Sequence, residues 1–173
     1  MRVVVTLIAA MMAIGAIAQE MMKPPAELAK LAFLLGSWKG NGTMDQGDGS
    51  TGKITDQAVG AKKLGDMWVE FKTNATMGAM GKMEGQLMLT YDTAKKKYVG
   101  SWFDSMSPQA MTMAGDFQGN KLVLDCDPID MGGPEKMVFR ITYDMVSAKE
   151  VVFLLDMKAG DQYVNALKIT YTK

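Results

Sequence analysis

The chain has 173 residues, of which 48% are hydrophobic and 22% are charged, a balance typical of one folded domain and not of a disordered segment. Lys plus Arg and Asp plus Glu each number 19, so the formal net charge is zero and nothing favours a nucleic-acid partner. The sequence has no histidine, which excludes Ser-His-Asp and Cys-His catalysis, His-ligated haem and nearly all zinc sites.

The first 18 residues have the layout of a secretory signal peptide. A short positive start is followed by an apolar run that ends at the small-x-small site Ala16-Ile17-Ala18. The run is about 15 residues, shorter than the ~20 residues that a membrane-spanning helix needs. We therefore expect cleavage near Ala18 and export to the periplasm or the extracellular space. The mature chain, residues 19–173, is then a single domain without a membrane span.

A short helix is expected at the start of the mature chain. Pro24-Pro25 suits a helix N-terminus, and Gly36 suits the C-terminal stop. Leu28, Leu31 and Leu35 are spaced for one apolar face. After Gly36 the period of the hydrophobic residues changes from helical to two.

Nine or ten segments of alternating apolar and polar residues follow, joined by short turns. They span residues 38–44, 53–59, 67–72, 83–91, 98–104, 111–117, 122–127, 137–143, 151–157 and 163–171. Short turns at even spacing predict up-and-down antiparallel pairing, and closure of the sheet removes its exposed edges. The sequence therefore predicts an all-β fold: a closed antiparallel up-and-down barrel of about 9–10 strands with a short N-terminal helix.

Several motifs carry a resemblance to a known family. The run Phe33-Leu-Leu-Gly-Ser-Trp-Lys-Gly-Asn-Gly42 resembles the opening strand of lipocalin-like barrels, where Gly-x-Trp follows a short helix. The stretch Lys96–Met106 contains Trp-x-Asp-x-Met, and Met77–Gly85 and the ending Lys168-Ile-Thr-Tyr-Thr add to the likeness. From about Leu28 to the C-terminus the chain resembles the bacterial domain-of-unknown-function family fifteen-seventy-nine. This resemblance implies a calycin-type barrel and no particular activity.

The opening strand is also similar to that of haem-binding barrels of the nitrobindin type. Those barrels hold the haem iron through a histidine on a late strand, and this chain has no histidine. The likeness therefore implies the fold but not the haem site, and no cofactor is predicted.

Four residues of the opening segment are expected to have structural roles. Trp38 is expected to plug the closed end of the barrel with its large ring. Gly36 ends the helix, while Gly40 and Gly42 are expected to mark curvature or bulges in a tightly coiled strand.

Methionine is the compositional oddity of the sequence. The chain has 18 methionines, and removal of the three in the signal peptide leaves 18 − 3 = 15. Met77, Met80 and Met83 are spaced by three, and thioethers are soft ligands that select Cu(I). The alternatives are that this segment packs against the core or lies over the barrel as a lid, because Met fills irregular apolar space.

A closed barrel of this size leaves room for about one small ligand, so the main expectation is an exported protein that binds a small apolar or amphipathic molecule. The expected lining residues are Trp102, Asp104, Met106, Met111, Met113, Phe117 and Phe139. Asp104 has two interpretations: a carboxylate inside an apolar cavity, or a turn residue that faces outward. A filled barrel with a structural or interaction role stays open, and without a recognisable catalytic constellation an enzyme is not expected.

The single cysteine excludes an intramolecular disulfide. Alternation places Cys126 on one face with Leu122 and Leu124, which predicts a buried apolar position. The alternative is a reactive thiol or an intermolecular disulfide.

Overall fold

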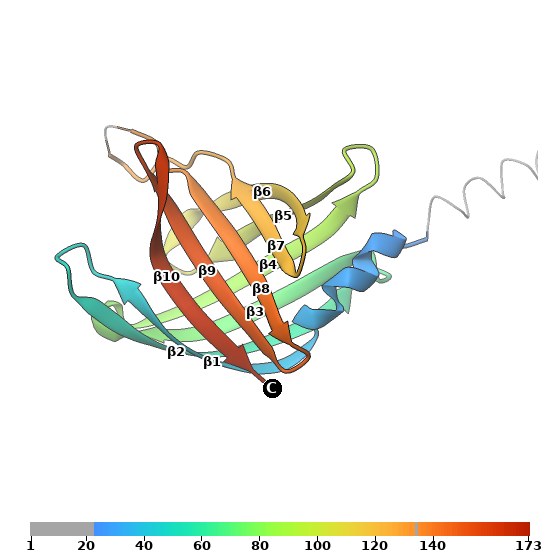
Figure 1. Ribbon diagram of the computed structural model, residues 1–173, viewed down its shortest axis with the longest axis horizontal. Helices are drawn as coiled ribbons and strands as arrows, with labels where there is room; N and C mark the ends of the chain where they lie inside the picture. The colour runs from blue at the N-terminus through green and yellow to red at the C-terminus, as the bar shows by residue number, and fades with distance from the viewer. Residues whose placement is uncertain (1–22, 134) are drawn as a thin grey trace, which may run out of the picture.

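Ten antiparallel strands close into a barrel in the computed structural model, which describes residues 23–133 and 135–173 (Figure 1). Each strand pairs with its neighbour in the sequence, and β1 pairs with β10, which confirms the closed up-and-down barrel. The predicted signal peptide, residues 1–18, lies outside the described residues. The strands are β1 (Gly36–Asp45), β2 (Thr51–Lys63), β3 (Trp68–Met77), β4 (Lys82–Asp92), β5 (Lys97–Asp104), β6 (Ser107–Gln118), β7 (Lys121–Cys126), β8 (Phe139–Ser147), β9 (Glu150–Ala159) and β10 (Gln162–Thr172).

The period of two in the sequence decides which side chains face the interior. Along β2, every second residue from Gly52 to Gly60 is buried and the residues between them are exposed. The same alternation continues in β3, where Val69 and Phe71 are buried. Successive side chains of a strand point to opposite faces, so each strand presents one apolar row to the barrel interior.

One end of the barrel is closed by η1 (Ala26–Leu34), a 3₁₀ helix that lies beside the strands in Figure 1. Its side chains Leu28, Leu31 and Leu34 are buried in the barrel, and Tyr98 Oη donates a hydrogen bond to the Glu27 carbonyl over 2.9 Å. The expected helix is therefore present, but it is a 3₁₀ helix and it plugs the barrel. None of the helices in the described ranges has the length and apolar character that crossing a bilayer requires.

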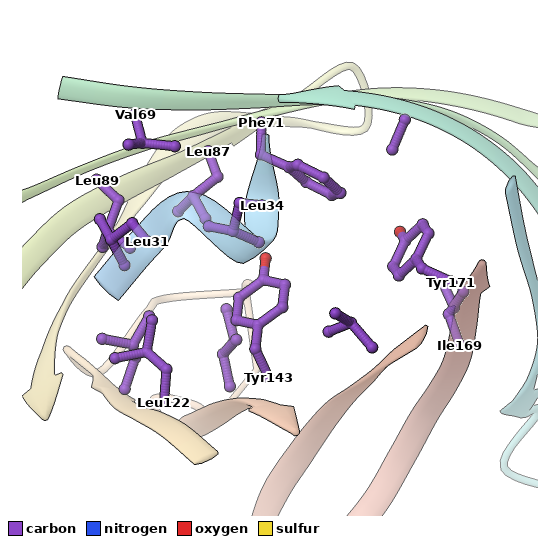
Figure 2. Close-up of a cluster of buried hydrophobic side chains, with 14 of the residues drawn as sticks. Leu31, Leu34, Val69, Phe71, Leu87, Leu89, Leu122, Tyr143, Ile169 and Tyr171 are labelled. Carbon is purple, nitrogen blue, oxygen red and sulfur yellow. The ribbon is translucent and has the colours of Figure 1, made fainter. Parts of the chain in front are cut away.

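A layer of aromatic rings crosses the barrel next to this plug. We call Phe71, Tyr143, Phe153 and Tyr171 the aromatic layer. Phe71 contacts Tyr171 edge-on with 5.6 Å between ring centroids, and Tyr143 contacts Phe153 at 5.2 Å. Figure 2 shows Leu31 and Leu34 of η1 on one side, followed by Phe71 and Tyr143 of the layer, with Tyr171 at the edge of the layer farther from η1. The layer separates a filled half of the barrel from the half that contains the site described below.

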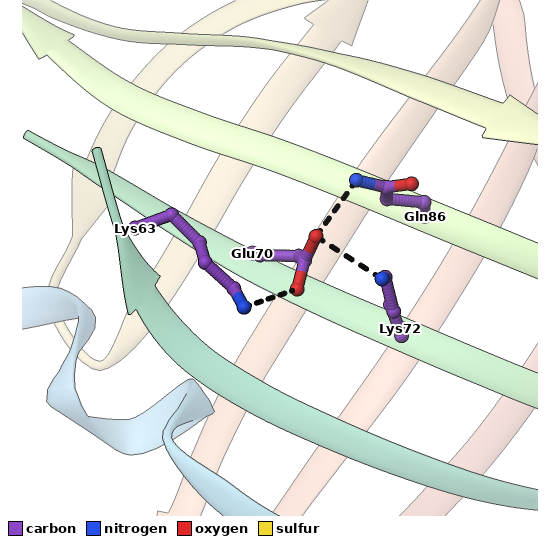
Figure 3. Close-up of polar contacts among 4 residues, drawn as sticks. All are labelled: Lys63, Glu70, Lys72 and Gln86. Atoms are coloured by element: carbon purple, nitrogen blue, oxygen red, sulfur yellow. Dashed lines mark hydrogen bonds and ion pairs between the residues drawn. The ribbon is translucent and has the colours of Figure 1, made fainter.

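The outer face of β3 carries one buried carboxylate, Glu70, whose neighbours in the sequence point inward. Lys63 and Lys72 each approach it to 3.4 Å, and Gln86 Nε2 donates to it over 2.8 Å (Figure 3). Buried charges are normally paired in this way, because desolvation of an unpaired carboxylate is costly.

Candidate functional site

A cavity of about 240 Å³ occupies the half of the barrel opposite η1. It is bounded by the aromatic layer and extends toward the far end of the barrel. We use "far end" for the end formed by η2 (Gly78–Met80), the β5–β6 turn and residues 127–133. Half of the residues that line the cavity are aliphatic or carry a thioether: Ile54, Ala75, Met77, Met83, Met111, Ile129, Met131, Ile141, Leu155, Leu167 and Ile169. Six aromatic side chains complete the apolar lining: Phe71, Trp102, Phe139, Tyr143, Phe153 and Tyr171.

Trp102 forms part of the wall and is held in place from two sides. Its indole Nε1 donates to Asp104 Oδ2 over 2.8 Å. Its ring lies over Gly85 on β4, where an added Cβ would come within 2.3 Å of two ring atoms. A glycine is required at this close approach, because any side chain would displace the indole.

Asp104 lines the cavity and also holds a turn, so it does not face outward as the second interpretation has it. Its carboxylate lines the cavity and anchors the Trp102 indole. Its other oxygen, Oδ1, accepts the backbone N–H groups of Met106 and Ser107 over 2.8 and 2.9 Å, which holds the β5–β6 turn.

The polar centre of the cavity is Asp56 on β2, which is only 5% exposed. Its Oδ1 accepts the backbone N–H of Asn74 over 2.9 Å, and its Oδ2 accepts the Tyr171 hydroxyl over 2.6 Å. Burial raises the pKa of the Asp56 carboxyl above its ordinary value, and these hydrogen bonds oppose the rise. The same burial holds the pKa of Tyr171 well above its usual range.

A second polar group faces the same cavity. Thr73 on β3 is 4% exposed and lines the cavity. Its hydroxyl is buried and has no hydrogen-bond partner among the described residues. Since buried hydroxyls are normally paired, an unpaired one in a cavity wall is a position where a ligand atom can bind.

The structure brings together part of the predicted lining. Trp102, Asp104, Met111 and Phe139 face the cavity. Met113 and Phe117 face the interior too, but they belong to the filled half: Met113 is 3% exposed, and the Phe117 ring packs 5.2 Å from that of Tyr98. Alternation gives the face of a strand but not the depth along the barrel axis, so these two residues were placed at the wrong level.

Met106 was expected in the lining and is instead 48% exposed in the β5–β6 turn. The pairing of β5 with β6 shifts register between Trp102 and Asp104. Such a shift interrupts the alternation, so counting by two from Trp102 gives the wrong face beyond Asp104.

The three methionines of the copper hypothesis are not placed alike. Met77 and Met83 line the cavity, whereas Met80 lies in η2 and is 53% exposed. Within residues 23–133 and 135–173, no group of three or more His, Cys, Asp or Glu side chains is arranged to hold a metal ion.

The structural residues of the opening segment lie as follows. Trp38 is 3% exposed, and its Nε1 donates to the Leu34 carbonyl at the end of η1 over 3.1 Å. Gly36 follows the helix with φ +94°, a left-handed conformation that favours glycine. Gly40 and Gly42 are not in bulges, because β1 keeps a continuous register with both of its neighbours. They allow residues of β10 to approach β1 closely: a Cβ at Gly42 would meet the Lys168 carbonyl oxygen of β10 at 2.0 Å.

Cys126 is buried, as alternation predicts, and it is a free cysteine. Burial raises the pKa of its thiol to about 12, and the neighbouring carboxylates of Asp125 and Asp127 add to the effect. The reactive thiolate is therefore scarce near neutral pH.

Sequence reasoning missed the polar centre. Asp56 stands in phase with Ile54 and Ala58 on the buried face of β2. Thr73 stands likewise between Phe71 and Ala75 on β3. A polar residue in phase with an apolar row was the signal that identifies both.

Comparisons with known proteins agree with this architecture. No curated protein matches the sequence. The fold is similar to the crystal structure of Rv2717c from M. tuberculosis, with a TM-score of 0.60, 14% identity, and coverage of 87% of this chain and 99% of that one. It is also similar to the S-type phycobiliprotein lyase CPES from Guillardia theta, with a TM-score of 0.57, 10% identity, and coverage of 87% and 98%. The family model described as "Protein of unknown function (DUF1579)" matches residues 23–173, and the chain therefore belongs to this family.

Proposed function

We propose that this protein is an exported carrier that binds a small apolar or amphipathic molecule in the barrel cavity. The observation that supports the proposal is the cavity of about 240 Å³ with its largely apolar wall. Apolar cavities of about 150 Å³ bind molecules the size of benzene, so this space is large enough for a somewhat bigger ligand. The few polar groups, Asp56, Thr73 and Asp104, would orient it.

Native mass spectrometry of the mature chain, residues 19–173, tests this function. The protein is purified from an exported preparation without metal chelators. We expect a reproducible extra mass that organic solvent releases. The variant Ala75→Leu, which places a larger side chain in the cavity wall, should lose that mass. If the wild-type protein shows no extra mass and does not bind an apolar fluorescent dye, a filled structural barrel is favoured.

Export itself is tested by the mass of the secreted protein, which should begin at Gln19. We propose binding without catalysis, although one structural neighbour is named a lyase. Incubation of the released ligand with fresh protein distinguishes the two, because an enzyme would change the ligand's mass and a carrier would not.

Cu(I) binding is the second candidate, and one observation favours it. Four thioethers line the same cavity: Met77, Met83, Met111 and Met131. Combined replacement of Met77, Met80 and Met83 should abolish Cu(I) binding in a competition titration with a chromogenic chelator. Met80→Leu alone is the matched control, since this side chain is exposed.

A further inference from the structure

The charges of the cavity wall are all of one sign. Two carboxylates, Asp56 and Asp104, face the space, and no Lys or Arg is among the described residues that line it. The rest of the lining is apolar apart from Thr73, Ser107, Gln109 and the two tyrosine hydroxyls.

Asp56 lacks the partner that the other buried carboxylate has. Glu70 on the outer face is 8% exposed and lies 3.4 Å from the ammonium groups of Lys63 and Lys72 (Figure 3). Asp56 is 5% exposed, and no described basic side chain forms an ion pair with it. Its two hydrogen bonds leave acceptor positions free, because a carboxylate accepts about four.

The surroundings of Asp56 suit a cationic group. Tyr171 holds the carboxylate and also belongs to the aromatic layer with Phe71 and Tyr143. Aromatic faces attract cations, most strongly where water is excluded. The unpaired Thr73 hydroxyl offers an acceptor for one N–H of a protonated amine.

The geometry points to an amphipathic organic cation as the ligand: its ammonium head binds Asp56 among the aromatic rings, and its apolar part lies against the methionines toward the far end. This inference rests on the proposed carrier function and specifies its ligand class. The ligand supplies the counter-charge that the cavity lacks, since a buried carboxylate is stabilised by a paired cation.

Three probes of equal length separate the possibilities: octylammonium, octanol and octanoate. Binding is followed by calorimetry and by the fluorescence of Trp102, the tryptophan in the cavity wall. We expect octylammonium to bind at least tenfold more tightly than octanol, because one charge-assisted hydrogen bond contributes about that factor to the affinity. Octanoate should bind most weakly.

The variant Asp56→Asn should remove the preference, so that octylammonium binds no more tightly than octanol. Asp66→Asn is the matched control: Asp66 is exposed in the β2–β3 turn with φ +67°, a conformation that asparagine accepts. This control should keep the wild-type preference.

A second measurement uses the wild-type protein only, in case Asp56→Asn does not fold. The affinity for octyltrimethylammonium, which is charged at every pH, should rise with pH as Asp56 ionises, while octanol binding stays constant. Tyr171 and Tyr143 face Asp56 and remain neutral, because burial raises the pKa of both hydroxyls. Asp104 is the other carboxylate of the wall, and Asp104→Asn should retain the pH dependence.

The outcomes separate the two proposals. If octanol or octanoate binds as tightly as octylammonium or more tightly, the inference of a cationic ligand is wrong, while the proposed carrier function still stands. Absence of binding by all three probes overturns the carrier function as well.

Discussion

Tyr171 Oη donates a hydrogen bond to Asp56 Oδ2 over 2.6 Å, although β10 and β2 are separated by β1. Gly40 on β1 is paired in register with both residues. A Cβ at Gly40 would lie 2.8 Å from Tyr171 Cε1. The missing side chain at position 40 therefore leaves room for the tyrosine to reach across β1 to the carboxylate.

Gly40→Ala should break this contact. The added methyl group displaces the Tyr171 ring and the Ile169 side chain, whose Cγ2 it would also meet at 2.8 Å. We expect a loss of about 1–3 kcal/mol in the free energy of unfolding, typical of overpacking, measured by urea denaturation. Gly52→Ala is the control, since the atoms nearest to its Cβ belong to the flexible side chains of Gln46 and Met44, which can move aside. Equal stability of the two variants would contradict the role of Gly40.

Asp56→Asn should change how stability depends on pH. An unfolded Asp titrates at about pH 4, and burial raises the pKa of Asp56 in the folded protein. The contribution of this group is therefore fully present below the unfolded pKa and is lost as the pH rises through the folded pKa. Asparagine cannot ionise, so it avoids that loss.

The free energy of unfolding of Asp56→Asn relative to wild type should accordingly grow from pH 4 to pH 7. Urea denaturation at the two pH values measures it, with Asp66→Asn as the control for loss of an exposed carboxylate. A relative stability that falls over this range would mean that the ionised form of Asp56 stabilises the fold.

Asp104→Ala should loosen both the cavity wall and the β5–β6 turn. The substitution removes the acceptor of the Trp102 indole and of two backbone N–H groups. We expect a loss of about 1–3 kcal/mol in stability, because the indole N–H is left unpaired. The tryptophan emission should also shift. Unchanged emission would show that Gly85 and the neighbouring strand are enough to hold the ring.

Much of the fold follows from local pattern. Alternation along each segment predicts nine or ten strands, of which the structure has ten, and short turns between them lead to sequential antiparallel pairing. The same period puts Trp102 and Met111, paired across β5 and β6, on one face. These features depend only on neighbours in the sequence, so the sequence suffices to predict them.

Depth along the barrel depends on the tilt and stagger of distant strands, which no local pattern contains. Phe117 and Phe139 both face inward, yet one packs beside η1 and the other lines the cavity. The bond from Tyr171 to Asp56 joins residues 115 positions apart, and only the closure of β1 on β10 brings them together. Alternation can therefore show that Asp56 faces the interior, but not that Tyr171 lies beside it in a cavity.

Cys126 should be inert in the folded protein. Its thiol is buried and its pKa is raised to about 12, so the thiolate population near neutral pH is very small. A chromogenic disulfide reagent should react slowly under native conditions and completely after denaturation in guanidinium. Fast stoichiometric labelling of the native protein would support the reactive-thiol alternative instead.

The plug and the cavity should respond separately to mutation. Leu31 of η1 has no exposed surface, and its truncation to alanine should cost about 2–5 kcal/mol through lost burial and a new void. Binding of octanol at a temperature where the variant is folded should be nearly unchanged, because Phe71 and Tyr143 lie between the plug and the cavity.

Phe139→Ala should have the opposite effects, a small one on stability and a large one on octanol binding. Phe139 lines the cavity and is only partly buried, so its truncation should affect stability less and octanol binding more. Calorimetric titration and thermal unfolding of both variants measure the two effects. If Leu31→Ala weakens binding as much as Phe139→Ala, the aromatic layer does not isolate the cavity. The leucines of η1 would then help to set the shape of the cavity, because packed interiors transmit strain.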